Sequence, residues 1–266
     1  MSTDQIRLSI FLGVFFLMLF LESRIPRHPT VDSKKRRLAI NLGLTFLNTG
    51  LIKLIFGAAA VGAAAYAREQ GWGLLNLFEV PAGLNILATV ILLDFAIYWQ
   101  HVLVHKVTFL WRFHIVHHSD LDLDVSSGFR FHPVEIVLSM LYKIAIVFLL
   151  GPSVTGVIVF EAVLNGMAQF THSNIRLPLR LDRALRYLFV TPDMHRIHHS
   201  VEVRETNSNY GFNLSVWDRL FGSYIEEARR PQPEIVIGVE QFRRPEEVSF
   251  GHLLSMPAQV RAVDQN

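Results

Sequence analysis

The stretch His101–His118 reads HVLVHKVTFLWRFHIVHH and carries two histidine motifs, HxxxH and HxxHH. A second HxxHH motif follows far downstream as HRIHH. Residues at positions i, i+3 and i+4 of a helix lie on one face, so each motif can aim its imidazoles at a common point. Neutral imidazole is the commonest protein ligand of transition metals, and eight such histidines can hold two ions. These eight are His101, His105, His114, His117, His118, His195, His198 and His199.

Chance does not explain the repeated motif. The chain has 12 histidines in 266 residues, and at that frequency an HxxHH motif is expected only about 0.02 times.

Two further histidines are candidate ligands. His172 lies in the sequence FTHSN, and His132 lies in FRFHP. Because Pro133 can begin a helix, His132 can instead cap that helix or pack against it.

The composition is that of a membrane protein. Hydrophobic residues make up 51% of the chain and charged residues 18%, where soluble domains have roughly one quarter charged. Cysteine is absent, which excludes disulfides, cysteine zinc sites, thiolate haem and iron–sulfur clusters within this chain. The net charge of +2 is small and forms no basic stripe, so nucleic-acid binding is not indicated.

Three apolar segments in the first part of the chain are predicted to lie in the membrane: Leu8–Leu21, Leu38–Ala67 and Leu84–Val104. We interpret the first as a retained segment, because charges of both signs precede it and no small-residue cleavage motif follows. The basic residues between 24 and 37 place that linker in the cytoplasm, unless they are simply a solvated charge run. Residues 68–81 then form an outer loop. A bacterial inner membrane is favoured over the endoplasmic reticulum.

Two later apolar stretches, Val134–Leu150 and Pro152–Phe170, are joined by Gly151-Pro152, which marks a turn. They predict a helical hairpin that enters the membrane and returns to the same side. The second stretch carries a polar stripe of Glu161, Asn165 and Gln169 that points toward His172. The predicted fold is therefore all-α, an integral membrane helical bundle with a cytoplasmic histidine-rich cap for two metals.

Asp94 lies inside the third predicted span and shares a helix face with Tyr98 and His101. An ionisable group within a span is a functional hypothesis by default. Asp94 is about 10 Å from His101 along the helix axis, too far to share a metal with it. We expect Asp94 and Tyr98 to support the site or line a substrate channel, although Asp94 could instead pair with a membrane lysine such as Lys53.

The downstream HxxHH motif has its own helix start signal. Thr191, Pro192 and Asp193 read as the N-cap and the first two helical positions, which favours presentation of the three histidines on a helix. The chain divides into N-terminal membrane helices with a basic loop (1–83), a catalytic domain (84–225) and a polar C-terminal cover or tail (226–266).

These motifs resemble the fatty acid hydroxylase/sterol desaturase superfamily. The resemblance lies in the order HxxxH, HxxHH, a single histidine in THSN and a final HRIHH, and it covers about residues 84–225. Supporting stretches are DFAIYWQHVLVH (Asp94–His105), WRFHIVHHSD (Trp111–Asp120), GFRFHPVE (Gly128–Glu135), TPDMHRIHHS (Thr191–Ser200) and NYGFNLSVWDRLFGSY (Asn209–Tyr224).

The resemblance implies a membrane-bound non-haem di-iron oxidoreductase that uses O2 to hydroxylate or desaturate a lipid, such as a sterol or a fatty acyl lipid. It implies nine metal ligands, the eight motif histidines together with His172. Ligand chemistry alone also suits zinc, copper or nickel, so the choice of iron rests on the resemblance. Ala168 stands where the family sometimes has a second histidine, which leaves open whether water or His132 completes one metal site.

No cofactor motif for electron delivery is present, so the resemblance predicts an external donor of ferredoxin or cytochrome b5 type. Arg112, Arg130 and Arg196 lie beside the histidine motifs and could dock that donor. Internal ion pairs with the aspartates of residues 120–124 or with Asp193 are the favoured alternative.

The lipid is expected to reach the metals from the bilayer. Four aromatic residues near the motifs, Trp99, Trp111, Phe113 and Phe131, could line its channel or anchor the protein at the interface.

Two other functions compete with oxidation. A metal transporter would place its ligands at mid-membrane on facing spans, and a zinc hydrolase would carry a glutamate as in HExxH. Neither pattern occurs here.

Overall fold

The computed structural model describes residues 3–260, and in that range its regular elements are helices, with three isolated antiparallel bridges between loops. The predicted all-α fold is therefore confirmed. The helices are α1 (Thr3–Arg24), α2 (Lys34–Phe56), α3 (Ala59–Glu69), α4 (Ala82–Lys106), α5 (Thr108–His118), α6 (Pro133–Leu150), α7 (Val154–His172), α8 (Leu179–Leu185), α9 (Pro192–His198), α10 (Val203–Thr206), α11 (Val216–Phe221) and α12 (Phe250–Ser255), with short 3-10 turns at Leu74–Asn76, Ser127–Phe129, Gln232–Glu234, Pro245–Val248 and Met256–Ala258.

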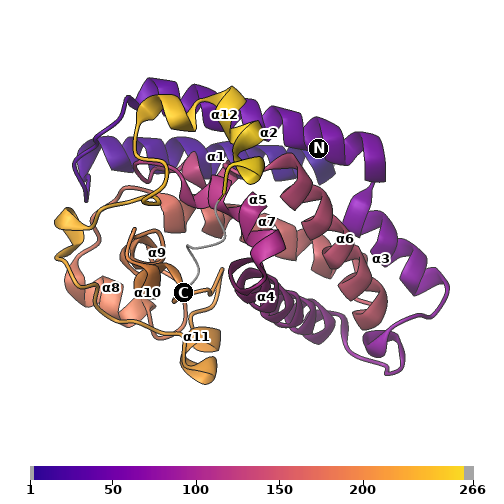
Figure 1. The fold of residues 1–266 in the computed structure, drawn as a ribbon. Helices are drawn as coiled ribbons and strands as arrows, with labels where there is room; N and C mark the ends of the chain where they lie inside the picture. Colours follow the sequence, from indigo (N-terminus) through magenta and orange to yellow (C-terminus); the bar gives the residue numbers. More distant parts are fainter. Residues whose placement is uncertain (1–2, 261–266) are drawn as a thin grey trace.

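Five helical segments are long and apolar enough to cross a membrane, and together they indicate an integral membrane protein. Figure 1 shows these long helices side by side, with α8 to α11 gathered at one end of the bundle and α3 at the other. Helix α7 packs against both α1 and α4, so it lies at the centre of the bundle. The five segments are Gln5–Arg24, Lys34–Asn76, Ala82–Lys106, Pro133–Leu150 and Val154–His172.

The second predicted span is broken, although the sequence predicts one continuous segment from Leu38 to Ala67. Gly57 has a φ of 56°, a left-handed conformation that ends α2, and α3 begins two residues later. Three alanines of α3, namely Ala60, Ala63 and Ala64, are buried in a cluster with Val147 of α6 and Phe160 of α7. Small side chains allow this close approach between helices. The break thus turns α3 out of the line of α2 and onto the hairpin of α6 and α7.

The predicted hairpin is confirmed, and glycine is required where it turns. Gly151 ends α6 in the left-handed conformation, with φ 60° and ψ 47°. A Cβ atom on Gly73 would lie 2.2 Å from the backbone nitrogen of Gly151, so the loop before α4 touches this turn directly. The Ser153 amide also donates a hydrogen bond to the Asn85 side chain. Residues 70–81 and the hairpin turn therefore share one end of the bundle, the end away from α8 to α11.

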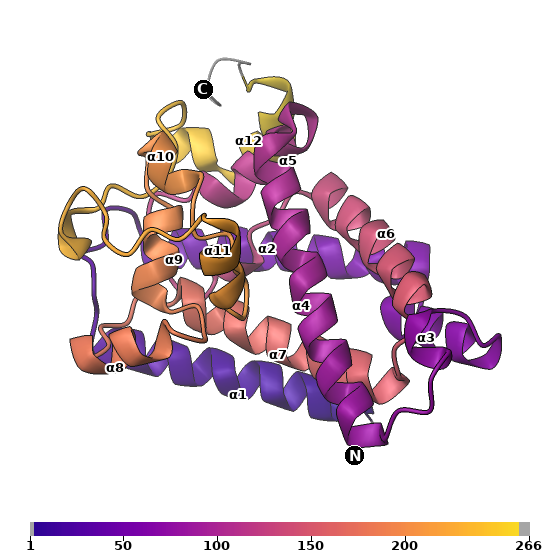
Figure 2. The ribbon, with the colours of Figure 1, turned by 90° about the horizontal axis from the view of Figure 1, so that it is seen from below.

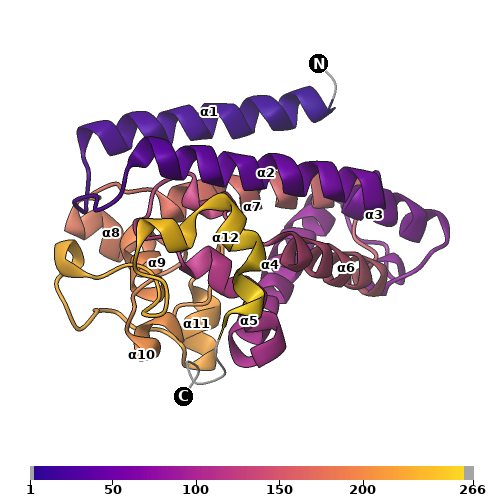
Figure 3. The same cartoon turned by 45° about the horizontal axis from the view of Figure 1, so that its top comes forward.

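A cap covers the other end of the bundle. It consists of α5, α8 to α11 and the segment up to Val260, and Figure 2 shows α9 and α11 on the side of the bundle where α4 and α7 have their C-terminal ends. Figure 3 shows α12 beside α2, and Leu253 and Met256 are buried in a cluster with Leu44 and Ile115. The described part of the predicted polar cover, residues 226–260, is therefore fixed to the protein by apolar contacts.

The basic linker is partly built into the protein. Arg37 is buried, and its guanidinium binds Asp120 at 2.7 Å and Asp124 at 2.8 Å. It also donates to the Asp122 carbonyl and the Ser127 hydroxyl. Arg37 thus ties the start of α2 to the loop that follows α5. Arg37 is therefore not part of a solvated charge run, and its charge acts within the fold.

Candidate metal centre

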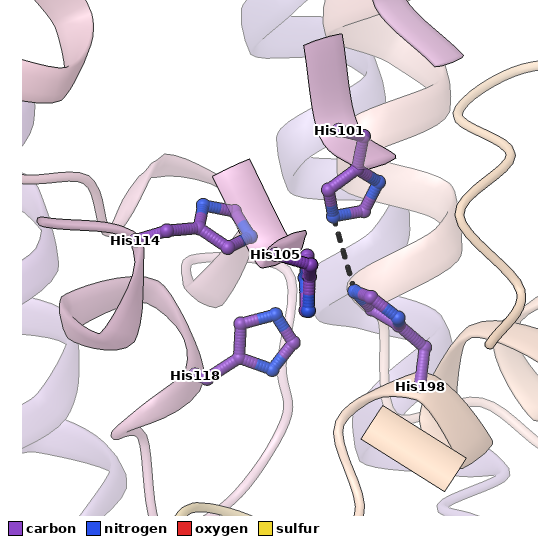
Figure 4. A group of neighbouring side chains, drawn as sticks. All are labelled: His101, His105, His114, His118 and His198. Carbon is purple, nitrogen blue, oxygen red and sulfur yellow. Dashed lines mark hydrogen bonds between the residues drawn. The ribbon is translucent and has the colours of Figure 1, made fainter. Parts of the chain in front are cut away.

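Nine buried histidines form two groups at the end of the bundle that the cap covers. Within each group, one ring nitrogen per residue lies within 4.8 Å of the others. Figure 4 shows the first group, in which imidazoles from α4, α5 and α9 converge. The first group is His101, His105, His114, His118 and His198, and the second is His117, His172, His195 and His199. The structure thus brings together all nine sequence-predicted ligands.

Each HxxHH motif is divided between the two groups, whereas the sequence predicts that each motif aims at one point. In α5, His114 and His118 face the first group and His117 faces the second. In the second motif, His195 of α9 and His199, which directly follows α9, face the second group, and His198 faces the first. Positions i and i+4 are about 40° apart around a helix, and position i+3 lies on the other side of i. Each short helix therefore lies between the groups and contributes to both.

Hydrogen bonds at Nδ1 orient several of these rings. His101 Nδ1 lies 2.7 Å from the Tyr210 carbonyl oxygen and His198 Nδ1 lies 2.7 Å from that of Ser208. His172 Nδ1 lies 2.8 Å from the Ala168 carbonyl oxygen. Because a carbonyl oxygen only accepts hydrogen bonds, each Nδ1 carries the proton and each Nε2 presents a lone pair to its group.

A carboxylate plays the same part for His114. Glu135, in the first turn of α6, lies 2.6 Å from His114 Nδ1 through Oε1, and both side chains are buried. Sequence reasoning missed Glu135 as a functional residue. The available signal was that Glu135 is an acidic residue in the first turn of the otherwise apolar helix α6. It also lies within the quoted stretch GFRFHPVE.

The distances between the Nε2 atoms fit bound metal ions. His101 Nε2 and His198 Nε2 are 3.1 Å apart, and His172 Nε2 is 3.0 Å from His195 Nε2. For the first pair both Nδ1 atoms are protonated, so two lone pairs face each other and repel unless a cation lies between them. Two metal–nitrogen bonds of about 2.1 Å at a right angle place their nitrogens about 3 Å apart. Both ring nitrogens of the buried His118 lack a hydrogen-bond partner, which also favours a cation.

Burial keeps the cap histidines neutral, the form that binds metals. Desolvation, with repulsion from neighbouring imidazoles, lowers the pKa values of His117, His118, His195 and His199 well below the usual value. Desolvation lowers the pKa of His198 to about 3, although its hydrogen bond to Ser208 opposes the shift. At neutral pH these rings therefore need no deprotonation before they bind a metal.

We expect the metal-free protein to lose stability as the pH falls. The folded-state pKa of His198 is about 3 and the unfolded value is about 6.5, so between these values the unfolded chain binds more protons and stability decreases with decreasing pH. At about pH 5.5 His198 alone costs about 1.4 kcal/mol of unfolding free energy. The midpoint of thermal unfolding of chelator-treated protein, measured between about pH 7.5 and 5.5, checks this. The His198→Gln variant should show a weaker pH dependence, and an equal dependence in both proteins would contradict the assignment.

Asp94 anchors the segment that positions His101. Its carboxylate accepts hydrogen bonds from the backbone amides of Asn213 and Leu214, both at 3.2 Å, and from Trp217 Nε1 at 2.8 Å. The alternative of pairing with Lys53 is therefore wrong. Tyr210, whose carbonyl oxygen binds His101, belongs to the same segment, so Asp94 supports the site through the backbone.

Tyr98 reaches this segment through a second buried carboxylate, which sequence reasoning missed. The Tyr98 hydroxyl lies 2.9 Å from Ser223 Oγ, which donates to Asp218 at 2.7 Å. Asp218 also accepts from the amides of Tyr210 and Gly211 at 2.7 and 2.8 Å. Burial raises the pKa of Asp218 to about 6, although these hydrogen bonds oppose the rise. The available signal was the position of Asp218 within the quoted stretch NYGFNLSVWDRLFGSY.

Of the polar stripe of α7, Glu161 connects this helix to its neighbours. Glu161 pairs with Arg7 of α1 at 2.5 Å and approaches Lys143 of α6 at 3.5 Å. Asn165 donates to the Glu161 carbonyl oxygen at 2.7 Å. Gln169 is fully buried, and neither of its side-chain polar atoms has a hydrogen-bond partner. Gln169 is therefore the one residue of the predicted stripe whose side chain has no hydrogen-bond partner. It lies three residues before His172 in the sequence.

The predicted helix start before the second HxxHH motif is confirmed. The Thr191 hydroxyl accepts a hydrogen bond from the Met194 amide, and Pro192 is the first residue of α9. Asp193 pairs with Arg196 at 2.6 Å and with Arg27 at 2.8 Å. Arg196 is thus buried in an internal ion pair, as the favoured alternative to donor docking predicts.

Arg130 is also internal, whereas Arg112 is exposed. The Arg130 side chain donates to the Val116 carbonyl, to the Asn41 side chain and to the Ser119 hydroxyl. Arg130 therefore holds the end of α5 and is not available on the surface to dock a partner.

His132 lies outside both histidine groups. Its Nδ1 accepts from the Val134 amide and caps α6, and its Nε2 lies 3.2 Å from the Leu254 carbonyl oxygen. This geometry matches the capping alternative.

The four predicted aromatic residues take different positions. Trp111 packs on the His105 ring at 5.0 Å, and Phe131 stacks on His117 at 4.4 Å. Phe113 lines an apolar cavity between α4, α5 and α6. Trp99 is 37% exposed on α4 and contacts Phe221. Two of these side chains thus pack against the histidines, and one of the four lines a cavity.

The sequence is similar to those of known lipid-modifying enzymes. A family model described as fatty acid hydroxylase matches residues 86–223. The chain is 29% identical over 243 residues to the ornithine lipid hydroxylase OlsE of Rhizobium tropici, which covers 86% of this chain and 70% of that protein. It is 30% identical over 219 residues to the alkylglycerol monooxygenase of Xenopus tropicalis, covering 81% and 47% of the two chains. No solved structure matches significantly.

The fold and the site define a helical membrane protein with two adjoining groups of buried histidines. Since the family model matches about half of the chain and includes all eight motif histidines and His172 within one continuous region, the chain belongs to the fatty acid hydroxylase family. The predicted family and the predicted class, an enzyme that oxidises lipids, are confirmed by these relatives. The chain spans about half the length of the alkylglycerol monooxygenase it matches.

Proposed function

We propose that this protein is a membrane-bound non-haem di-iron oxidoreductase that uses O2 to hydroxylate or desaturate a C–H bond of a bilayer lipid. The observation that carries the proposal is the pair of adjoining histidine groups at the inner ends of the spans. His117 and His118 are neighbours in the chain but belong to different groups, and the rings of His118 and His199 stack across the two groups at 4.4 Å. Two metals held by these residues would occupy adjoining sites, and they would supply the redox chemistry for a reaction with O2.

Each group would hold one iron through its ring nitrogens. The first group offers five histidines and the second offers four, which assigns the nine ligands without His132. Iron bound in this way supplies the electrons that turn O2 into an oxidant for an unactivated C–H bond. The chain itself orients the rings, through Tyr210, Ser208, Ala168 and Glu135, and buries them away from water.

The position of the site supports a route for the lipid, a location for the cap and an external electron donor. Histidines of α4 and α7 lie at the ends of candidate spans, so a lipid can approach from the bilayer. The basic linker supports a cytoplasmic location for the cap, and a bacterial relative favours a bacterial inner membrane. We propose an external electron donor of ferredoxin or cytochrome b5 type at this face, and residues 84–225 as the catalytic domain.

The proposal is tested by metal analysis and isotope labelling. We expect protein purified from an iron-supplied host to contain about two irons per chain. With a reductant system and 18O2, we expect labelled oxygen in a lipid product or, for a desaturation, O2 consumption matched to alkene formation. Comparing the lipids of cells with and without the gene identifies the substrate. An active enzyme that retains stoichiometric zinc and does not need O2 would overturn the proposal.

A further inference from the structure

The cap has an apolar edge that the described part of the chain leaves uncovered. This edge, the cap rim, consists of residues 176–189, which contain α8 and the turn after it, and residues 219–221 at the end of α11. The two segments are neighbours, because Arg219 donates to the Arg186 carbonyl oxygen at 3.1 Å. The large apolar side chains exposed on the rim are Leu179, Leu181, Tyr187, Leu188, Phe189, Leu220 and Phe221. An exposed apolar surface of this kind marks a contact with a membrane or with another protein.

The rim begins where two candidate membrane spans end. Helix α7 ends at His172, and three residues later Ile175 forms an antiparallel bridge with Pro26, just beyond the end of α1. The Arg176 amide donates to the Ile25 carbonyl oxygen at 2.8 Å. Since α1 and α7 are both candidate spans, the start of the rim lies at the membrane surface on the side of the histidines.

The other end of the rim lies against a lipid-facing side of α4. One side of α4 carries, at intervals of four residues, the side chains Ile91, Phe95, Trp99 and Leu103. Three of them are exposed, and because α4 is a candidate span this side faces lipid. The Phe221 ring lies 6.0 Å from the Phe95 ring and 5.0 Å from the Trp99 ring, and Figure 2 shows α11 beside α4. The rim therefore continues the lipid-facing surface of a span.

The depth of this contact places the end of α11 within the membrane boundary. Trp99 is seven residues before Lys106, the last residue of α4, which is about 10 Å along the helix axis. Leu220, beside Phe221, is 70% exposed. A leucine that is exposed at this depth contacts lipid and not water.

The exposed charges of the rim are all positive. Within residues 176–189 they are Arg176, Arg180 and Arg183. The one acidic residue of this stretch, Asp182, is buried and pairs with Arg186 at 2.6 Å. Arginine side chains can lay their aliphatic stems on an apolar surface and extend their charges to the head groups of a membrane. A row of arginines beside exposed leucines and aromatic rings matches the boundary layer of a membrane that contains anionic lipids.

We propose that the cap rim is inserted into the head-group layer of the membrane on the side of the histidines, and that Arg176, Arg180 and Arg183 bind the head groups of anionic lipids there. The exposed leucines and aromatic side chains lie at the boundary with the acyl chains. This binding surface goes beyond the proposed oxidation and does not depend on it. The part of the cap around α10 remains in water.

The insertion is tested with single-cysteine labels, which are specific because the chain has no cysteine of its own. Leu188→Cys and Leu220→Cys place a fluorescent label on the rim, and Val203→Cys places it on α10, where Val203 is also exposed. The full-length protein is measured in nanodiscs with a quencher attached to the lipid chains and with acrylamide dissolved in the water. We expect lipid quenching of both rim labels, and acrylamide quenching at least about 3-fold weaker than for the α10 label.

Two outcomes would overturn the insertion. Rim labels that acrylamide quenches as strongly as the label on Val203 would place the rim in water. Rim labels that neither quencher reaches would mean that a second copy of the chain or another protein covers the rim.

Arginine variants test the lipid class. Protein is extracted from membranes made of equal amounts of phosphatidylglycerol and phosphatidylcholine, and the retained lipids are quantified by mass spectrometry. We expect the wild type to retain at least about 5-fold more phosphatidylglycerol, and the triple variant Arg176→Gln, Arg180→Gln and Arg183→Gln to lose most of this preference. The corresponding triple lysine variant keeps the charge and should keep the preference. Equal retention of the two lipids by the wild type would refute binding of anionic lipids.

The matched control removes the same charge elsewhere in the cap. Arg204 lies on α10, Arg229 and Arg230 lie close to it, and all three are exposed. The triple variant Arg204→Gln, Arg229→Gln and Arg230→Gln should retain phosphatidylglycerol as the wild type does. An equal loss in both glutamine variants would show a general effect of charge and would contradict a site on the rim. Because retention is measured without O2 or reductant, the result is independent of the proposed reaction.

Discussion

Replacing His117 by alanine is expected to remove one metal from the protein and abolish turnover. The second group has four histidines, and the variant leaves three, with the Nε2 atoms of His172 and His195 still facing each other. The site then lacks a ligand that also lies 3.1 Å from His172. We expect the metal content to fall from about two to about one per chain, with a decrease in turnover of at least about 100-fold.

His198→Ala provides the contrast. Its group of five retains four histidines, so we expect a smaller loss of metal than in His117→Ala but an equally severe loss of turnover. His252→Ala is the control, because His252 is exposed and outside both groups. Mass-spectrometric metal analysis and a turnover assay on the same preparations measure both effects. Full activity in His117→Ala or His198→Ala would refute the ligand assignment.

The Arg37→Met substitution is expected to have the largest effect on stability. It leaves Asp120 and Asp124 buried without the guanidinium that contacts each within 2.8 Å. Burial alone raises the pKa of Asp120, but Arg37 and Arg130 more than compensate and lower it well below the usual value, so this carboxylate is ionised in the folded protein. Removing one partner of a buried ion pair costs about 3–5 kcal/mol.

The measurement is the midpoint of thermal or denaturant unfolding in detergent, with the exposed Lys35→Met on the same helix as the control. Lys35→Met should change stability by less than about 0.5 kcal/mol. The double substitution Arg37→Met with Asp120→Asn should recover part of the loss, because it removes one of the unpaired charges. If Arg37→Met is as stable as the control, the buried network contributes nothing to the fold.

The sequence predicted the long apolar helices and the histidines that gather in the cap, because both depend on local patterns. Long apolar runs must be helical in a bilayer, where backbone groups have no water to bind. The helix start at Thr191 and the turn at Gly151 were also readable, since capping residues act within a few positions. The break at Gly57 was not predicted, because an apolar segment of that length satisfies the hydropathy pattern whether or not it bends.

Most residues that orient the histidines could not be identified from the sequence. Glu135, Tyr210 and Asp218 act through contacts between parts of the chain that are far apart, and Tyr210 acts through its backbone carbonyl, which any residue type possesses. Asp94 was recognised as unusual because a carboxylate in a span is rare. Its partners, the amides of residues 213 and 214, carry no side-chain signature.

The stretch His101–His118 by itself determined that imidazole clusters lie where a membrane helix ends, since spacing and hydropathy are properties of the chain. Only the tertiary structure decided how those histidines are shared. Each HxxHH helix lies between the two groups and sends its i and i+4 residues to one group and its i+3 residue to the other. The physical reason is that a helix displays side chains around its whole circumference. The packing of neighbouring helices decides which of these side chains come together in one group.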